Sequence, residues 1–187
     1  MPLLDPVQWL VDHGVPEGAA SHSANASACA EVSVGQPSEA GIACTQVGEV
    51  ARGNELERVY RVLERRTITV VRSKKPVVVA DVIETVEPLD KEEATQPDLV
   101  NLEMQLAADG RSLVVQDRSS DFDLGRGEHR PRVSCDDALV KRGSPRSSDV
   151  MDVRWDRFDR ELVSRACSQR GRWVWKAGRF SLVRGAR

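Results

Sequence analysis

The C-terminal segment carries the residues whose types and spacing are best suited to binding chemistry. Aromatic and basic side chains alternate there, and the seven of interest are Arg170, Arg172, Trp173, Trp175, Lys176, Arg179 and Phe180. Exposed rings in such an arrangement stack on nucleic-acid bases, while the neighbouring cations contact phosphates. The pattern therefore predicts a surface that binds RNA or another polyanion.

The same residues have a second interpretation that the pattern leaves open. Trp173 and Trp175 flank Val174, and Phe180 and Leu182 flank Ser181, which predicts a short β-hairpin with Gly178 in its turn. Alternation also fits a half-buried strand whose rings point inward as ordinary core. A chain with only 4% aromatic residues needs such core material. The side of the hairpin that faces water decides between the two.

Charge is distributed unevenly along the chain. The formal net charge is −2, but residues 1–50 carry −6 with no Lys or Arg, and residues 154–187 carry +7. Arginine outnumbers lysine 22 to 5, and its planar guanidinium binds phosphate bidentately. This asymmetry is typical of an acidic arm and a phosphate-facing surface. We expect the arm to compete for the basic surface; in the alternative, the two ends simply attract each other.

Enzyme signatures are missing from the sequence. There is no P-loop, nucleophile elbow or H-E-x-x-H motif, and the glycines at 125 and 127 lack the third glycine of a dinucleotide loop. His13, His22 and His129 fall in segments predicted to be mobile, where a general base is not held in place. We therefore expect a non-enzymatic protein without catalytic residues and without a cofactor.

The four cysteines are Cys29, Cys44, Cys135 and Cys167, and they are widely spread. A small disulfide-framed domain packs its cysteines more densely, so free thiols are expected. A zinc site can be drawn from Cys29, Cys44, His129 and Cys135. It lacks the C-x₂₋₄-C spacing that lets one turn offer two ligands, and no metal site is therefore predicted.

The residues before 54 predict little regular structure. Asp5 as cap and Pro6 at the first helical position predict a short helix that ends at His13 and Gly14. From residue 15 to residue 53, Ala, Ser, Gly and acids follow one another without a sustained apolar period. Such a segment is expected to be mostly disordered, because burial does not offset the entropy of ordering it.

Residues 54–117 predict a small α/β core. Its first helix would begin at Asn54, since Leu56, Val59, Tyr60 and Leu63 share one helical face. Strands are expected at 67–71 and 77–86, joined as a hairpin through Lys74 and Lys75. Leu99, Leu102 and Leu106 predict a second helix over 97–108, which stops at Gly110 and leads into a strand at 112–116.

The remaining segments complete a predicted α+β fold. Residues 118–150 are polar and are expected to form a flexible loop or linker. Residues 151–187 should supply a basic helix over about 152–168 and the hairpin, packed on the core. The whole would be one small mixed core of about three helices and five strands, with long disordered N-terminal and central segments.

No stretch approaches the roughly 20 apolar residues of a membrane span, and the N-terminus lacks the basic flank of a signal peptide. A cytoplasmic or nuclear, non-secreted protein is expected. In composition alone, without a motif, the chain loosely resembles accessory proteins of compact viral genomes. The leading hypothesis is a regulatory or accessory protein that binds RNA or another polyanion through its C-terminal region. The alternative is a protein–protein adaptor anchored by Trp9 and the C-terminal aromatics.

Overall fold

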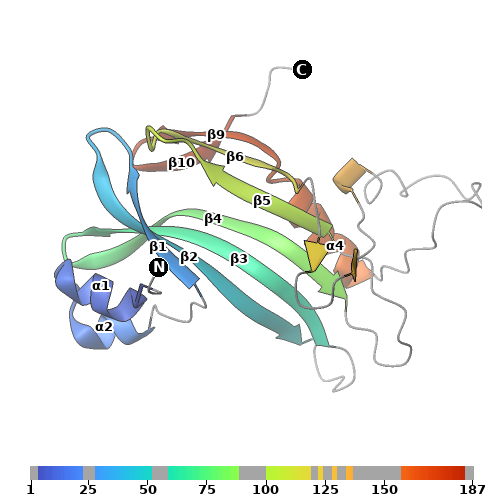
Figure 1. The fold of residues 1–187 in the computed structure, drawn as a ribbon, viewed down its shortest axis with the longest axis horizontal. Coiled ribbons are helices and arrows are strands. Elements are labelled where there is room, and N and C mark those ends of the chain that lie inside the picture. Colours follow the sequence, from blue (N-terminus) through green and yellow to red (C-terminus); the bar gives the residue numbers. More distant parts are fainter. Residues whose placement is uncertain are drawn as a thin grey trace, which may run out of the picture.

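The chain folds around one eight-stranded sheet in which every pair of neighbouring strands is antiparallel (Figure 1). The computed structural model describes residues 4–22, 28–51, 59–88, 100–118, 122–123, 128–129, 134–136 and 157–183. The sheet strands are β1 (Ala28–Val34), β2 (Glu39–Ala51), β3 (Val59–Arg72), β4 (Lys75–Pro88), β5 (Val100–Leu106), β6 (Ser112–Asp117), β9 (Gly171–Lys176) and β10 (Arg179–Leu182). A separate two-residue pairing joins β7 (Phe122–Asp123) to β8 (Glu128–His129).

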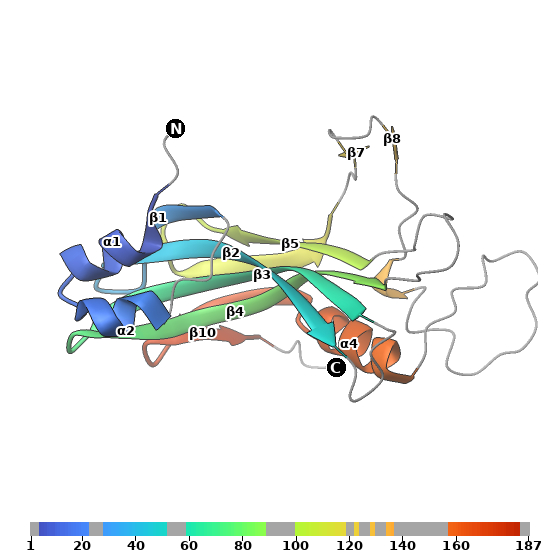
Figure 2. The ribbon, with the colours of Figure 1, turned by 90° about the horizontal axis from the view of Figure 1, so that it is seen from below.

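Helices cover the two ends of this sheet. Figure 2 shows α1 (Pro6–Asp12) and α2 (Glu17–His22) at one end and α4 (Arg157–Cys167) at the other. The prediction for α1 is confirmed: the Asp5 carboxylate accepts hydrogen bonds from the first turn, and the helix ends at His13. The predicted C-terminal helix is confirmed over 157–167. Among the described helices, none is long and apolar enough to cross a membrane.

Two of the hairpins were predicted from sequence and are confirmed. The strands at 67–71 and 77–86 lie within β3 and β4, and β9 pairs with β10 around Ala177 and Gly178. Both turns have positive φ at their two central residues, Ser73 and Lys74 in one and Ala177 and Gly178 in the other. Such turns match the twist of the strands that they join.

The sheet bends so that its two halves enclose the main core. Side chains that alternate along the strands meet there, and Ile68, Val70, Leu102, Leu113 and Phe180 are all buried. A smaller cluster lies under α1 and α2, where Trp9 and Leu10 pack on Ile42 and Cys44 of β2. One face of β2 therefore contributes to the second core.

The predicted α+β fold is wrong, because the structure is dominated by the eight-stranded antiparallel sheet. Residues 59–72, expected to begin as a helix, form β3 along their whole length. The apolar spacing of Val59, Tyr60 and Leu63 fits a helix locally, but β2 and β4 pair with this segment on both sides. Backbone pairing to two partners, which a local pattern does not contain, decides the conformation.

The predicted helix over 97–108 is also wrong, since residues 100–106 form β5. Leu102 and Met104 are buried, while Glu103 and Gln105, which alternate with them along the strand, are not. The sequence thus contains both the alternation of a strand and the leucine spacing of a helix. The segment forms a strand because Leu102–Leu106 pair with β6.

Residues 28–51, expected to lie in a disordered arm, form β1 and β2 instead. Their small side chains bury little area individually, but Gly41 through Ala51 pair with β3 and extend the same sheet. Most of the predicted flexible segment 118–150 lies outside the described residues, and so does the expected cap Asn54.

Side chains satisfy the backbone where β4 and β5 separate. These strands pair only at Thr85–Asn101 and Val86–Val100 among the described residues. Next to this opening, the Glu84 carboxylate accepts a hydrogen bond from Met104 N at 2.7 Å. The Gln169 side chain accepts from Ile83 N at 3.0 Å and donates to Ile83 O at 3.1 Å. These three hydrogen bonds pair backbone groups beside the opening, while the other Glu84 carboxylate oxygen, Oε2, accepts no hydrogen bond from the residues that the structure describes and lies 3.4 Å from Arg66 Nε.

The expectation of free thiols is wrong. Cys29 is bonded to Cys44 across β1 and β2, and Cys135 is bonded to Cys167 at the end of α4. The sequence spacing hid these pairs because β pairing places residues 15 apart directly opposite each other. Three of the four atoms of the drawn zinc site are therefore disulfide sulfurs. The cytoplasmic or nuclear location stays a prediction, and the redox state of these cysteines in cells is a direct test of it.

Candidate functional site

The C-terminal hairpin divides its predicted binding residues between two faces. Strand pairing sets Trp175 opposite Phe180 and Lys176 opposite Arg179. Because directly opposed residues share a face, the aromatic rings lie together on one side of the hairpin and the cations on the other. Arg172, Lys176 and Arg179 are exposed, whereas Phe180 is 4% exposed.

The aromatic face packs into the protein. Trp175 contacts Phe180 edge to face, with ring centroids 5.1 Å apart, and a Cβ added at Gly35 would lie 2.7 Å from the Trp175 ring. The indole N–H of Trp173 donates to the Gln169 carbonyl at 2.9 Å. Both tryptophans are partly buried against the main core. These contacts favour the interpretation of the rings as core, and they leave the cations as the part of the hairpin that faces solvent.

Arg170 serves a structural contact. Its guanidinium donates to Asp117 at 3.0 Å and to Asp136 at 2.7 Å, and Asp117 also accepts from Cys135 N. The hydrogen bond that Arg170 donates to Asp136 is the main cause that raises the pKa of Arg170, and the same bond lowers the pKa of the Asp136 carboxyl. Arg170 thus clamps the segment that the Cys135–Cys167 disulfide ties to α4.

Four hairpin turns meet at the opposite end of the sheet from α4, and we call this region the turn end (Figure 1). The turn between β1 and β2 donates from Gly35 N to Gly110 O of the β5–β6 turn at 2.9 Å. Trp175 N of β9 donates to Arg111 O at 2.8 Å. The Arg72 guanidinium, at the β3–β4 turn, lies 5.7 Å from the centroid of the Trp175 ring. Segments more than a hundred residues apart in sequence are therefore in contact.

The turn end is strongly basic. Its six cations are Arg72, Lys74, Lys75, Arg111, Lys176 and Arg179, and its two carboxylates are Glu39 and Asp109. All of these cations except Arg72 are exposed, and none of those five forms an ion pair with a residue that the structure describes. Unpaired cations held on tight turns attract an extended anion without the cost of breaking internal pairs.

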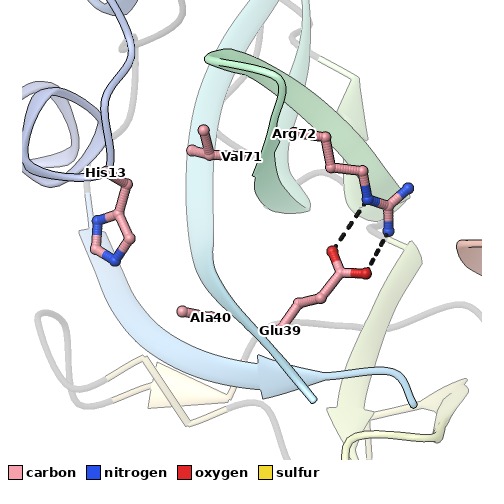
Figure 3. Close-up of a pocket in the computed structure, with 5 residues that line it drawn as sticks. All are labelled: His13, Glu39, Ala40, Val71 and Arg72. Atoms are coloured by element: carbon pink, nitrogen blue, oxygen red, sulfur yellow. Dashed lines mark hydrogen bonds and ion pairs between the residues drawn. The ribbon is translucent and has the colours of Figure 1, made fainter. Parts of the chain in front are cut away.

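A shallow cavity of about 420 Å³ opens beside this region (Figure 3). Arg72 and Glu39 form one side of it, and Figure 3 shows His13 on the other side, beyond Val71 and Ala40. His13 was expected to be mobile, but its ring stacks on the Trp9 ring, with the two centroids 3.9 Å apart. Its Nδ1 also lies 2.7 Å from the Trp9 carbonyl oxygen. In the described part of the chain, no group of three or more His, Cys, Asp or Glu is placed to hold a metal ion.

The structure thus brings together only part of the set that the sequence singled out. Lys176 and Arg179 lie at the turn end, Arg172 lies farther along β9, and Arg170 belongs to the α4 clamp. Sequence reasoning missed Arg72, Lys74, Lys75 and Arg111. The neighbouring lysines 74 and 75 were a visible signal, but they looked like a simple connection because nothing local places them beside a hairpin a hundred residues later.

The adaptor alternative depends on aromatic side chains that a partner can reach. Trp9 is 5% exposed and lies in the cluster under α1 and α2, and the C-terminal rings pack inward. The geometry therefore does not favour aromatic anchoring. No family model, no curated protein and no solved structure matches this chain, and the functional inference rests on the geometry of the turn end.

Proposed function

We propose that this chain is a non-enzymatic regulatory or accessory protein that binds RNA through phosphate contacts at the turn end. The observation that carries the proposal is the set of five exposed cations without ion pairs among the described residues: Lys74, Lys75, Arg111, Lys176 and Arg179. Three different turns supply them, so a strand that crosses this end meets cations from each.

Base stacking is not part of the proposal. Trp175 and Phe180 hold the β9–β10 turn on the core, and their contribution is to fix where Lys176 and Arg179 point. Binding dominated by phosphate contacts has little sequence preference and depends strongly on salt. For about five contacts to a single strand, the slope of log affinity against log salt concentration is about −3 to −4.

The test is fluorescence anisotropy of a labelled, mixed-sequence single-stranded RNA titrated with the protein at several salt concentrations. The double variant Lys176→Glu with Arg179→Glu should weaken binding roughly tenfold to a hundredfold and flatten the salt slope. Arg165→Glu is the matched control for the single variant Arg179→Glu, because each reverses one charge and Arg165 is exposed on α4 at the far end of the sheet. Affinity that is independent of salt, or equal losses in the turn-end and α4 variants, would overturn the proposal.

A further inference from the structure

Arg72 is the one turn-end cation with an ion pair among the described residues. Its Nε donates to Glu39 Oε2 at 3.0 Å and its Nη2 donates to Oε1 at 3.1 Å, which is a bidentate arrangement. Both side chains are one-third exposed, at 34% each, and they line the cavity of Figure 3. The planar guanidinium fork binds a phosphate group with the same two-point geometry that it uses for a carboxylate.

Other contacts hold Arg72 in position independently of Glu39. The guanidinium lies over the Trp175 ring, and the turn glycine Gly178 leaves room for its third nitrogen. A Cβ at Gly178 would come within 2.8 Å of Arg72 Nη1. The Arg72 guanidinium therefore contacts the Trp175 indole on one face and the Gly178 turn along one edge. These contacts keep its Nε and Nη2 directed at the cavity when another anion replaces the Glu39 carboxylate.

We infer that Arg72 is a phosphate-binding residue, and that Glu39 occupies its fork until a phosphate of bound RNA displaces the carboxylate. The inference rests on the proposed function, since the surrounding cations must first bring the strand to the turn end. The exchange replaces one bidentate anion by another, so it retains the hydrogen bonds of Arg72. Glu39 is released toward solvent, to which it is already partly exposed.

Glu39 comes from the acidic N-terminal fifty residues, and this gives the expected competition between the acidic arm and the basic surface a specific form. The competing group is one carboxylate at the start of β2, held in place by the β1–β2 turn that packs on Trp175 and Gly110. A partly exposed ion pair of this kind is weak enough to be displaced by a polyanion.

The first test compares Glu39→Gln with Asp109→Asn in the same RNA titration. Both variants remove one negative charge from the turn end, but Asp109 accepts a hydrogen bond from the Arg111 backbone N and no guanidinium, and asparagine retains that acceptor. Glu39→Gln should bind RNA roughly threefold to fivefold more tightly than Asp109→Asn, because it alone frees a guanidinium. Its salt slope should stay close to that of Asp109→Asn, because Arg72 contacts the same phosphate in both complexes and only the displacement of the Glu39 carboxylate is spared.

Adding Arg72→Gln to Glu39→Gln should abolish this gain. Equal affinities of Glu39→Gln and Asp109→Asn would overturn the role of Arg72 while leaving the proposed function intact, provided that the Lys176 and Arg179 reversal still weakens binding. Failure of that reversal would instead remove the proposed function.

A second measurement follows RNA binding on the unaltered chain and uses a variant only to assign one resonance. The Nε–H resonance of Arg72, assigned by its loss in Arg72→Gln, should shift when the RNA is added. The Nε–H resonance of Arg170 should stay in place, because its partners Asp117 and Asp136 lie at the other end of the sheet. An Arg72 signal that does not move at saturating RNA contradicts the exchange.

Discussion

The two ends of the sheet place arginine in opposite surroundings. At the α4 end, Arg170 is shared between Asp117 and Asp136. At the turn end, Arg111 and Arg179 have no ionic partner among the described residues, and Arg72 has one exchangeable carboxylate. The residue type is the same, but at one end it stabilises the fold and at the other it is available to a ligand. Pairing, which composition does not report, makes the difference.

The largest expected effect is on the α4 end alone. Replacing Cys135 and Cys167 by alanine removes a disulfide that joins residues 32 positions apart in sequence. Because the unfolded chain is then less restricted, the free energy of unfolding should fall by about 3–4 kcal/mol. Urea denaturation measures this loss. RNA affinity, measured well below the unfolding transition, should stay unchanged because the turn end does not contact this disulfide. A parallel loss of affinity would show that the two ends are not independent.

Arg170→Ala and Arg179→Ala should separate stability from binding. Removing Arg170 leaves Asp117 without this partner and should cost about 1 kcal/mol of unfolding free energy, with RNA affinity nearly unchanged. Removing Arg179 should leave the unfolding free energy unchanged and weaken binding severalfold. Thermal unfolding and anisotropy on the same samples provide the comparison. If both variants lose affinity equally, the sequence-derived set of seven residues describes the site better than the turn end does.

Lys74→Gly should have a smaller effect, and it should raise the stability of the fold while weakening RNA binding. Lys74 has φ +61, a left-handed conformation that glycine adopts without a steric penalty. The variant should gain about 0.5–1 kcal/mol of unfolding free energy. Glycine removes the strain of the left-handed backbone at this position, and the greater flexibility that glycine gives the unfolded chain offsets part of that gain. It should also bind RNA more weakly, because one turn-end cation is lost. Lys75→Gly, at the adjacent position in β4, is the control that should lose binding without gaining stability.

The finest distinction concerns pH. Burial is the main cause that raises the pKa of Glu84, and the nearby negative charge of Glu64 on β3 raises it further. The hydrogen bond from Met104 N and the positive charges of Arg66 and Arg118 lower it. A raised pKa in the folded state means that this group stabilises the fold when protonated, and that this stability is lost as pH rises through the folded pKa. Relative to Glu84→Gln, the unaltered chain should therefore gain unfolding free energy as pH is lowered from 7 toward the ordinary glutamate pKa. Parallel pH profiles for the two chains would contradict this assignment.

The sequence by itself determined the elements whose signals are local. Asp5 and Pro6 start α1, the β-branched run at 67–71 forms part of β3, and the alternating rings with Gly178 form the β9–β10 hairpin. In each case, the residues that make the decisive contacts lie within a few positions of one another. The basic character of the C-terminal region was likewise readable from residue counts.

Only the tertiary structure decided the sheet, the disulfides and the composition of the turn end. Residues 59–66 and 100–106 carry apolar spacings that fit a helix or a strand, and pairing with distant strands selects the strand. Lys74 and Lys75 join Lys176 and Arg179 because the sheet bends until Arg72 reaches Trp175. Arg170, from the same basic segment, is withdrawn from the surface set by Asp117 and Asp136. Whether a cation is paired depends on carboxylates that folding brings from elsewhere in the chain, and a linear pattern does not contain that information.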